Sequence, residues 1–279
     1  MPLVPTGSLV VPGTGVGAFN VITLEHAEAI VAGAASVDRP VILQISENAV
    51  AFHGGRVGPV AAAAAAVARS APVDVALHLD HVESPALLRA AADCDFGSVM
   101  TDFSGMSYVD NVAATREAAE FAHAHGLWIE SELGTVGGKD GAPPLSPHAP
   151  GARTDAGEAA AYVDATGVDG LAVAVGSSHA MTSRSASLDL ELIAALRDAV
   201  PVPLVLHGSS GVPDGQLRDA VLAGIVKVNV GTALNLAFTG AVRGALLADP
   251  SVVDPRKYLS KAREAMAATV AHFLTVLAG

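Results

Sequence analysis

The sequence predicts an α/β protein, a (β/α)8 TIM barrel with extra helices at its C-terminal end. Eight short apolar segments alternate with longer helical segments along the chain, and this alternation is typical of parallel strands joined by right-handed crossovers. The length of 279 residues fits one such barrel, since these have ~250 residues. The residues are 51% hydrophobic but only 4% aromatic, as expected for aliphatic strands covered by helices on both faces.

The strands are apolar runs bounded by turn residues or by the first residues of a helix. We expect them at residues 17–21, 41–46, 75–81, 98–103, 127–133, 170–176, 203–207 and 226–230. Eight strands favour a closed barrel over an open doubly wound sheet. No G-x-G-x-x-G motif follows the first strand, which weakens the alternative of a dinucleotide-binding fold.

Helical segments follow the strands, and several begin with a recognisable cap. Thr23 precedes the first helix, and Ser84 with Pro85 begins the third, where serine is a favoured N-cap and proline a favoured first residue. We expect helices ending near residues 36, 69, 125, 165, 199, 223 and 247, and one or two more within 255–277. The loops at 47–58 and 135–153 are long and rich in glycine, as binding segments and lids often are.

Length, charge and cysteine content limit the kinds of protein that this chain can be. We expect one domain over residues 1–279, with an irregular segment at 1–16 and a helical extension at 255–279. The net charge of −12 argues against binding to nucleic acid or to an anionic membrane. Cys94 is the only cysteine, so no intrachain disulfide is possible, which fits a reducing cytoplasm. We expect neither a signal segment nor a membrane-spanning run.

Three of the apolar strands each deliver a histidine at their C-terminal end, namely His81, His179 and His207. Active sites of such barrels lie at the C-terminal ends of the strands, so we expect these three side chains to meet at one rim. Three imidazoles can hold one zinc ion and leave a fourth position open for substrate. Three separately hydrogen-bonded histidines are the alternative. The other histidines fall elsewhere: His53 and His78 are undecided, and we expect His26, His123, His125, His148 and His272 to be solvated.

Carboxylates accompany these histidines. Asp80 directly precedes His81, so it could exchange a proton with a hydroxyl beside a metal-bound carbonyl. It could instead orient a histidine. Asp102 and Glu132 end the fourth and fifth strands, and we expect each to support the metal ligands or to act as an alternate ligand.

Two segments rich in small residues follow the seventh and eighth strands: Gly208-Ser209-Ser210-Gly211 and Asn229-Val230-Gly231-Thr232. Each precedes a helix N-terminus, where backbone N–H groups favour phosphate, and phosphate often binds at this part of the barrel. Small residues also serve tight turns, which is the alternative interpretation of these two segments. Asn20 and Ser46 add polar groups at the ends of the first two strands. The direction of Lys227, within the eighth strand, stays open.

Seven motifs along residues 17–232 share an order with a known family. They are Ala18-Phe19-Asn20-Val21, His78-Leu79-Asp80-His81, Ser98-Val99-Met100-Thr101-Asp102, Glu132-Leu133-Gly134-Thr135-Val136-Gly137-Gly138, Gly176-Ser177-Ser178-His179, Leu206-His207-Gly208-Ser209-Ser210-Gly211 and Lys227-Val228-Asn229-Val230. In this order they resemble the class II (zinc-dependent) fructose-bisphosphate/tagatose-bisphosphate aldolase family.

The resemblance implies a function and assigns roles. The enzyme would cleave a phosphorylated ketose, with fructose or tagatose 1,6-bisphosphate as candidates, into dihydroxyacetone phosphate and an aldehyde through a zinc-stabilised enediolate. The three histidines would hold Zn2+ or another divalent metal, and Asp80 would exchange a proton with the C4 hydroxyl. The residues implied at the substrate are Asn20, Ser46, Gly208, Ser210, Asn229 and Thr232. Na+ or K+ near the phosphate and a homodimer or homotetramer are also implied.

Several positions depart from the family pattern. Asp140 stands where the family has a glutamate that moves the enediolate proton, and Ala180 and Val82 replace glycines. Ser209 occupies the second position of the usual Gly-Gly-Ser-Gly turn. These changes lie around the substrate and leave the metal site intact. Two alternatives therefore stay open: an aldolase for a different sugar or sugar-acid phosphate, and a catalytically weak barrel that binds zinc or a sugar phosphate.

Overall fold

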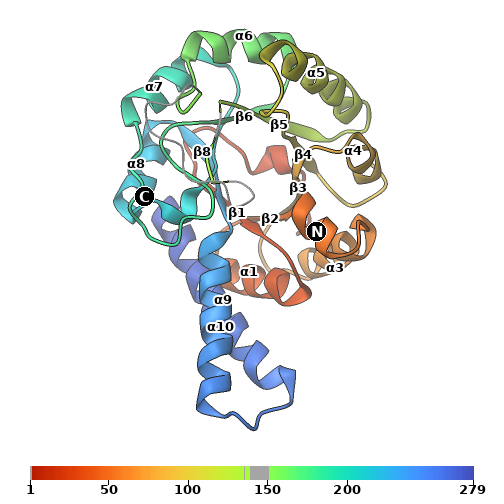
Figure 1. Ribbon diagram of the computed structural model, residues 1–279, viewed down its shortest axis with the longest axis vertical. Coiled ribbons are helices and arrows are strands. Elements are labelled where there is room, and N and C mark those ends of the chain that lie inside the picture. The colour runs from red at the N-terminus through yellow and green to blue at the C-terminus, as the bar shows by residue number, and fades with distance from the viewer. Residues whose placement is uncertain (1, 135, 139–150) are drawn as a thin grey trace.

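The computed structural model describes residues 2–134, 136–138 and 151–279 of the chain. Its eight strands form one closed barrel in the order β1 to β8, and each neighbouring pair is parallel, including β1 with β8 (Figure 1). The predicted (β/α)8 barrel is confirmed. The strands are β1 (Val16–Asn20), β2 (Val41–Ser46), β3 (Val75–Val82), β4 (Ser98–Thr101), β5 (Trp128–Leu133), β6 (Gly170–Val173), β7 (Leu204–Leu206) and β8 (Ile225–Val230).

Helices surround the barrel as an outer ring (Figure 1). Their bounds are α1 (Leu24–Ser36), α2 (Glu47–Phe52), α3 (Val57–Arg69), α4 (Pro85–Ala91), α5 (Tyr108–Ala124), α6 (Ala156–Thr166), α7 (Leu190–Ala199), α8 (Asp214–Ala223), α9 (Thr232–Ala248) and α10 (Pro255–Leu277). The segment expected as a loop at 47–58 contains α2, because the hydroxyl of Ser46 accepts from the backbone N–H of Ala49 and caps this short helix. Among the described residues, no helix combines the length and apolar character needed to cross a membrane.

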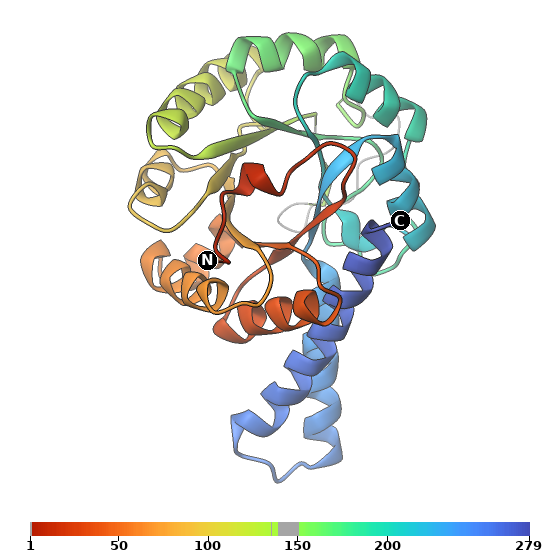
Figure 2. The same cartoon turned by 180° about the vertical axis from the view of Figure 1, so that it is seen from behind.

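The N-terminal segment closes the bottom of the barrel, at the N-terminal ends of the strands (Figure 2). Leu3 bridges to Val75 at the start of β3, and a 3-10 turn, η1 (Thr6–Ser8), follows. Val10 packs inside the barrel in a small apolar cluster with Ile42. This closure keeps the lower barrel dry, so polar groups above it must satisfy one another.

The two C-terminal helices form a hairpin whose far end projects from the barrel (Figure 1). The other end packs on the body: Gly33 of α1 lies so close to α10 that a Cβ there would stand 2.5 Å from the carbonyl oxygen of Ala267. The prediction that His26 is solvated is wrong. Its residue is 5% exposed and its ring stacks on Phe238 of α9, a contact between distant segments that helical periodicity does not reveal.

Candidate active site

Three histidines from different strand ends meet at the C-terminal rim of the barrel. His81, His179 and His207 each offer a ring nitrogen, and these atoms all lie within 4.8 Å of one another. Their ring centroids are 4.8 to 5.7 Å apart. A tetrahedral zinc ion takes nitrogen ligands at ~2.0–2.1 Å, so modest rotations of the rings bring the three nitrogens to one ion. The donor set therefore fits a divalent metal such as zinc.

A local distortion of β3 lets Asp80 and His81 face the same cavity. Consecutive residues of a regular strand point to opposite faces. Here the pairing of β3 with β4 shifts register between Leu79 and Val82, and His81 has a positive φ of 52°. A non-glycine residue in this conformation costs on the order of 1–3 kcal/mol, a strain typical of functional sites.

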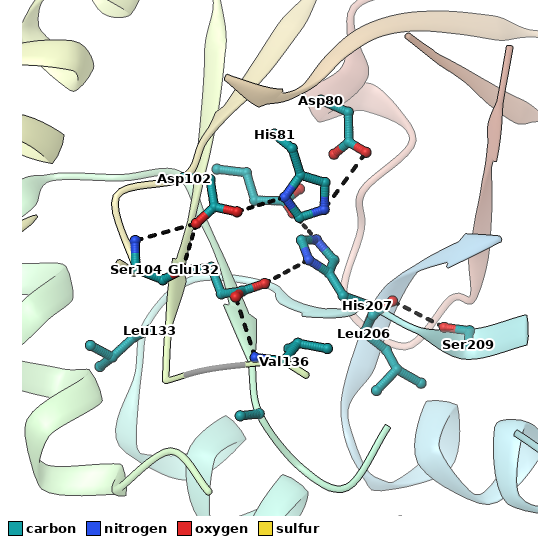
Figure 3. A network of polar contacts seen from close by, with 12 residues as sticks. Asp80, His81, Asp102, Ser104, Glu132, Leu133, Val136, Leu206, His207 and Ser209 are labelled. Atoms are coloured by element: carbon teal, nitrogen blue, oxygen red, sulfur yellow. Dashed lines mark hydrogen bonds and ion pairs between the residues drawn. The ribbon is translucent and has the colours of Figure 1, made fainter. Parts of the chain in front are cut away.

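Carboxylates hold two of the histidines (Figure 3). The Nδ1 atom of His81 lies 2.8 Å from Oδ2 of Asp102, which leaves Nε2 for a metal in the usual carboxylate–histidine–metal arrangement. His207 has a carboxylate on each nitrogen: Glu132 lies 2.9 Å from Nδ1 and Glu130 lies 2.9 Å from Nε2. A metal that binds His207 therefore replaces one of these two contacts.

The charges beneath His207 are fully buried. Lys227 donates to the other oxygen of Glu130 at 2.8 Å, and both side chains have no exposed surface. Burial opposes ionisation of Glu130, but Lys227 and His207 outweigh it and lower its pKa to about 2. Burial likewise opposes protonation of His207, but the two glutamates outweigh it and raise its pKa to about 9. These groups form one compensated cluster of charge.

Asp80 presents a buried carboxylate to the same rim. Its side chain is 2% exposed, and Oδ2 lies 4.0 Å from Nε2 of His81. Burial favours the neutral acid, but His81 and His78 hold the pKa of Asp80 well below its usual range. The group is therefore an ionised carboxylate next to the histidine cluster, which is the state that a general base requires.

A cavity of about 360 Å³ opens above these groups. Its walls include ten of the residues predicted for the site: Asn20, Ser46, Asp80, His81, Asp102, His179, Gly208, Ser210, Asn229 and Thr232. Glu132 lies below the cavity against His207. Asp140 lies outside the described residues, so its position relative to the cavity stays a prediction.

One side of the cavity is built from small residues around two helix starts. Gly208 has a φ of 66°, and a Cβ there would stand 2.5 Å from the backbone of Ser178, so only glycine fits without displacement. The turn continues as η3 (Ser209–Gly211). The hydroxyl of Ser210 accepts from the backbone N–H of Ala233 in the first turn of α9. The loop and helix thus meet with backbone N–H groups at the cavity.

Comparisons with known proteins decide the family. The family model "Fructose-bisphosphate aldolase class-II" matches residues 11–279. The chain belongs to the class II fructose-bisphosphate aldolase family. It is 40% identical over 265 residues to the fructose-bisphosphate aldolase of Geobacillus stearothermophilus, covering 91% of this chain and 88% of that protein. The resemblance seen in the sequence motifs is confirmed. The protein is an aldolase, a lyase that cleaves carbon–carbon bonds.

Solved structures agree with this assignment. The YdjI aldolase from Escherichia coli K12 matches with a TM-score of 0.80 and 29% identity, covering 95% of this chain and 92% of that one. A putative fructose-1,6-biphosphate aldolase from Coccidioides immitis matches with a TM-score of 0.82 and 27% identity, covering 95% and 91%. Class II aldolases are generally zinc-dependent, and the three histidines of this aldolase form a group that could hold such an ion.

The aldolase also contains site residues that the sequence analysis did not select. Glu130 contacts His207 directly, and Lys227, whose direction was open, points into the barrel towards Glu130. The signal for Glu130 was present, since it lies two residues before Glu132 and so shares its face of the strand. Gly138 and Ser178 also line the cavity; they belong to the quoted motifs but were given no role. The other cavity residues gave no such signal: Gln44, Glu47, Asn48, Glu83 and Asn235.

Proposed function

We propose that this aldolase cleaves a phosphorylated ketose into dihydroxyacetone phosphate and an aldehyde, with fructose 1,6-bisphosphate as the first candidate and tagatose 1,6-bisphosphate as the second. The observation that carries the proposal is the meeting of three histidine nitrogens at a cavity whose walls include His81, His179 and the buried carboxylate of Asp80. The name of the Geobacillus relative supports the bisphosphate.

His81, His179 and His207 would hold the divalent metal, with Asp102 and Glu132 as supporting or alternate ligands. When bound, a metal ion there polarises the substrate carbonyl as a Lewis acid. Asp80 removes the proton from the C4 hydroxyl as the C3–C4 bond breaks, because it is ionised and faces the cavity. A well-placed general base of this kind contributes ~10²–10⁴-fold to the rate.

The phosphate would lie between the turn at Gly208–Ser210 and the start of α9 at Thr232. The hydroxyl of Ser210 accepts from Ala233, so its own hydrogen can point to a phosphate oxygen. The helix dipole and the N–H groups at this end of α9 favour an anion. A Na+ or K+ ion near this phosphate is part of the proposal.

Asn229 would contact the carbon skeleton of the substrate. It is 7% exposed, and neither polar atom of its side chain has a hydrogen-bond partner among the described residues. Buried amides are normally satisfied, so an oxygen-rich ligand in the cavity accounts for this one. Asn20 and Ser46 line the same space. Asp140 would move the enediolate proton.

Copies of the chain would associate as a homodimer or homotetramer through the α9–α10 hairpin. The end of this hairpin exposes Leu247 at 83% and Val253 at 90%, and burying such apolar side chains between copies would be favourable. Light scattering on the wild type and on Leu247→Glu tests this: a dimer that the variant breaks supports it, and a monomeric wild type excludes it. We also propose that residues 1–279 form a single domain and that the protein lies in the cytoplasm.

The central test separates two half-reactions. Zinc-loaded protein should exchange the C3 proton of dihydroxyacetone phosphate with deuterium in the absence of any aldehyde, and EDTA-treated protein should not. Asp80→Asn should keep this exchange but lose cleavage of fructose 1,6-bisphosphate. Absence of exchange in zinc-loaded protein would contradict the proposal. Exchange without cleavage of either bisphosphate would point to a different aldehyde partner.

A further inference from the structure

A chain of buried polar side chains runs from the N-terminal segment to Asp80. The hydroxyl of Thr6 lies 2.6 Å from the hydroxyl of Ser98. That of Ser98 lies 2.7 Å from Nδ1 of His78, and Nε2 of His78 lies 3.6 Å from Oδ1 of Asp80. Thr6, Ser98 and His78 are completely buried, and Asp80 is 1% exposed. None of the first three lines the cavity, so the chain approaches Asp80 from below.

The last gap in this chain has a clear physical meaning. Nε2 of His78 and Oδ1 of Asp80 have no hydrogen-bond partner among the described residues. A separation of 3.6 Å is slightly too long for a hydrogen bond. Leaving two buried polar groups unsatisfied is energetically unfavourable, and a shift of about half an ångström satisfies both.

The proton positions along the chain are consistent with one direction. If Nε2 of His78 carries the hydrogen and donates to Asp80, then Nδ1 accepts from Ser98, and Ser98 accepts from Thr6. Each hydroxyl then uses its one hydrogen once. A protonated ring would also donate from Nε2, so the role of His78 towards Asp80 does not depend on its charge.

We propose that His78 is a positioning residue for Asp80: the chain Thr6–Ser98–His78 fixes one carboxylate oxygen so that the other faces the C4 hydroxyl of the substrate. This inference rests on the proposed role of Asp80 in cleavage. It assigns a catalytic consequence to the N-terminal segment, because Thr6 in η1 anchors the far end of the chain. Neighbouring strands hold the intermediate members, since His78 pairs with Ser98 in register.

The inference predicts a selective defect. Misplacing a catalytic group by about 1 Å can cost ~10²-fold in rate, so His78→Leu should lower kcat for cleavage of fructose 1,6-bisphosphate by about 10- to 100-fold. KM and zinc content should stay at wild-type values. Exchange of the C3 proton of dihydroxyacetone phosphate should also persist, because that step does not use the C4 hydroxyl.

Two more variants grade the effect. His78→Gln places an amide N–H near Asp80 and should recover most of the lost cleavage rate. Ser98→Ala removes the donor to Nδ1 and should reduce cleavage by a smaller factor than His78→Leu. Tyr162→Phe is the control, since it removes a buried hydroxyl on the outer side of β5 that bonds Ser131. Its ratio of cleavage to exchange should match the wild type.

The outcomes distinguish this inference from the proposed function. Two results would refute the role of His78 while Asp80→Asn remains selective for cleavage. In one, His78→Leu lowers the rates of cleavage and exchange by the same factor. In the other, His78→Leu lowers neither rate. If Asp80→Asn itself reduces both equally, the proposed function of Asp80 fails. Crystal structures of the wild type and of Ser98→Ala test the positioning without any substrate. The Asp80 carboxylate should rotate in Ser98→Ala, and an unchanged carboxylate orientation there would overturn the inference.

Discussion

Replacing Lys227 with methionine removes one member of a buried ion pair and leaves the other charged. Lys227 and Glu130 have no exposed side-chain surface, and Nζ lies 2.8 Å from the carboxylate. Methionine is similar in length, so the change leaves little empty volume. The dominant effect is therefore electrostatic: Glu130 loses the contact that contributes most to lowering its pKa to about 2.

The magnitude follows from what remains around Glu130. Breaking a buried pair by removing one partner costs ~3–5 kcal/mol. His207 stays 2.9 Å from the other oxygen of Glu130 and its raised pKa of about 9 lets it carry a compensating charge. We therefore expect Lys227→Met to lower the free energy of unfolding by about 3 kcal/mol, the lower end of this range. With a urea m-value of about 3 kcal/mol/M for a chain of this size, the midpoint should fall by ~1 M.

Urea unfolding followed by circular dichroism measures this shift. All samples should contain EDTA, because a bound metal would stabilise the variants by different amounts. The matched control is the double variant Lys227→Met/Glu130→Gln, in which neither charge remains. It should recover at least half of the loss, since a neutral buried amide costs less than an unpaired carboxylate. The reasoning would be refuted if Lys227→Met lowered the free energy of unfolding by less than ~1 kcal/mol. It would also be refuted if the double variant were less stable than Lys227→Met.

Three other predictions concern pH, backbone strain and metal. Burial lowers the pKa of His26 from 6.5 to about 4, so the unfolded chain binds this proton more tightly and stability falls as the pH drops from 6.5 towards 4. The loss at pH 5 should be about 2 kcal/mol, and His26→Leu should abolish this part of the pH dependence; equal slopes in both proteins would exclude it. Ala180 has a φ of 56°, so Ala180→Gly should relieve strain of ~1 kcal/mol, partly offset by unfolded-state entropy; a Tm lower than that of the wild type would contradict this. EDTA should lower the Tm of the wild type, by the equivalent of ~4 kcal/mol for zinc at 1,000 times its Kd, but not that of His207→Ala; equal shifts in the two proteins would contradict the assigned ligand.

Much of the fold could be predicted because the barrel repeats one local pattern. The second strand was expected at 41–46 and lies at Val41–Ser46, since proline before it and polar residues after it mark both ends. The rim could be predicted for a similar reason: closing a parallel barrel brings the C-terminal ends of all strands together. His81, His179 and His207 therefore meet although up to 126 positions separate them.

The remaining features depend on contacts between distant segments. The burial of His26 requires α9 to pack over α1. The inward direction of Lys227 depends on the register of β8 beside β1 and β7. The shared orientation of Asp80 and His81 contradicts strict strand alternation, and it arises from a register shift and a positive φ. Sequence periodicity carries no signal for such irregularities.

Metal analysis of purified protein tests the central claim most directly, because it asks whether the three histidines hold one ion. After dialysis against zinc and then buffer, the wild type should retain about one zinc per chain, and His179→Ala should retain less than about a tenth of that. His125→Ala is the control, since His125 lies at the exposed end of α5 and bonds the carbonyl of Phe121; it should match the wild type. Equal zinc in His179→Ala and the wild type would contradict the account.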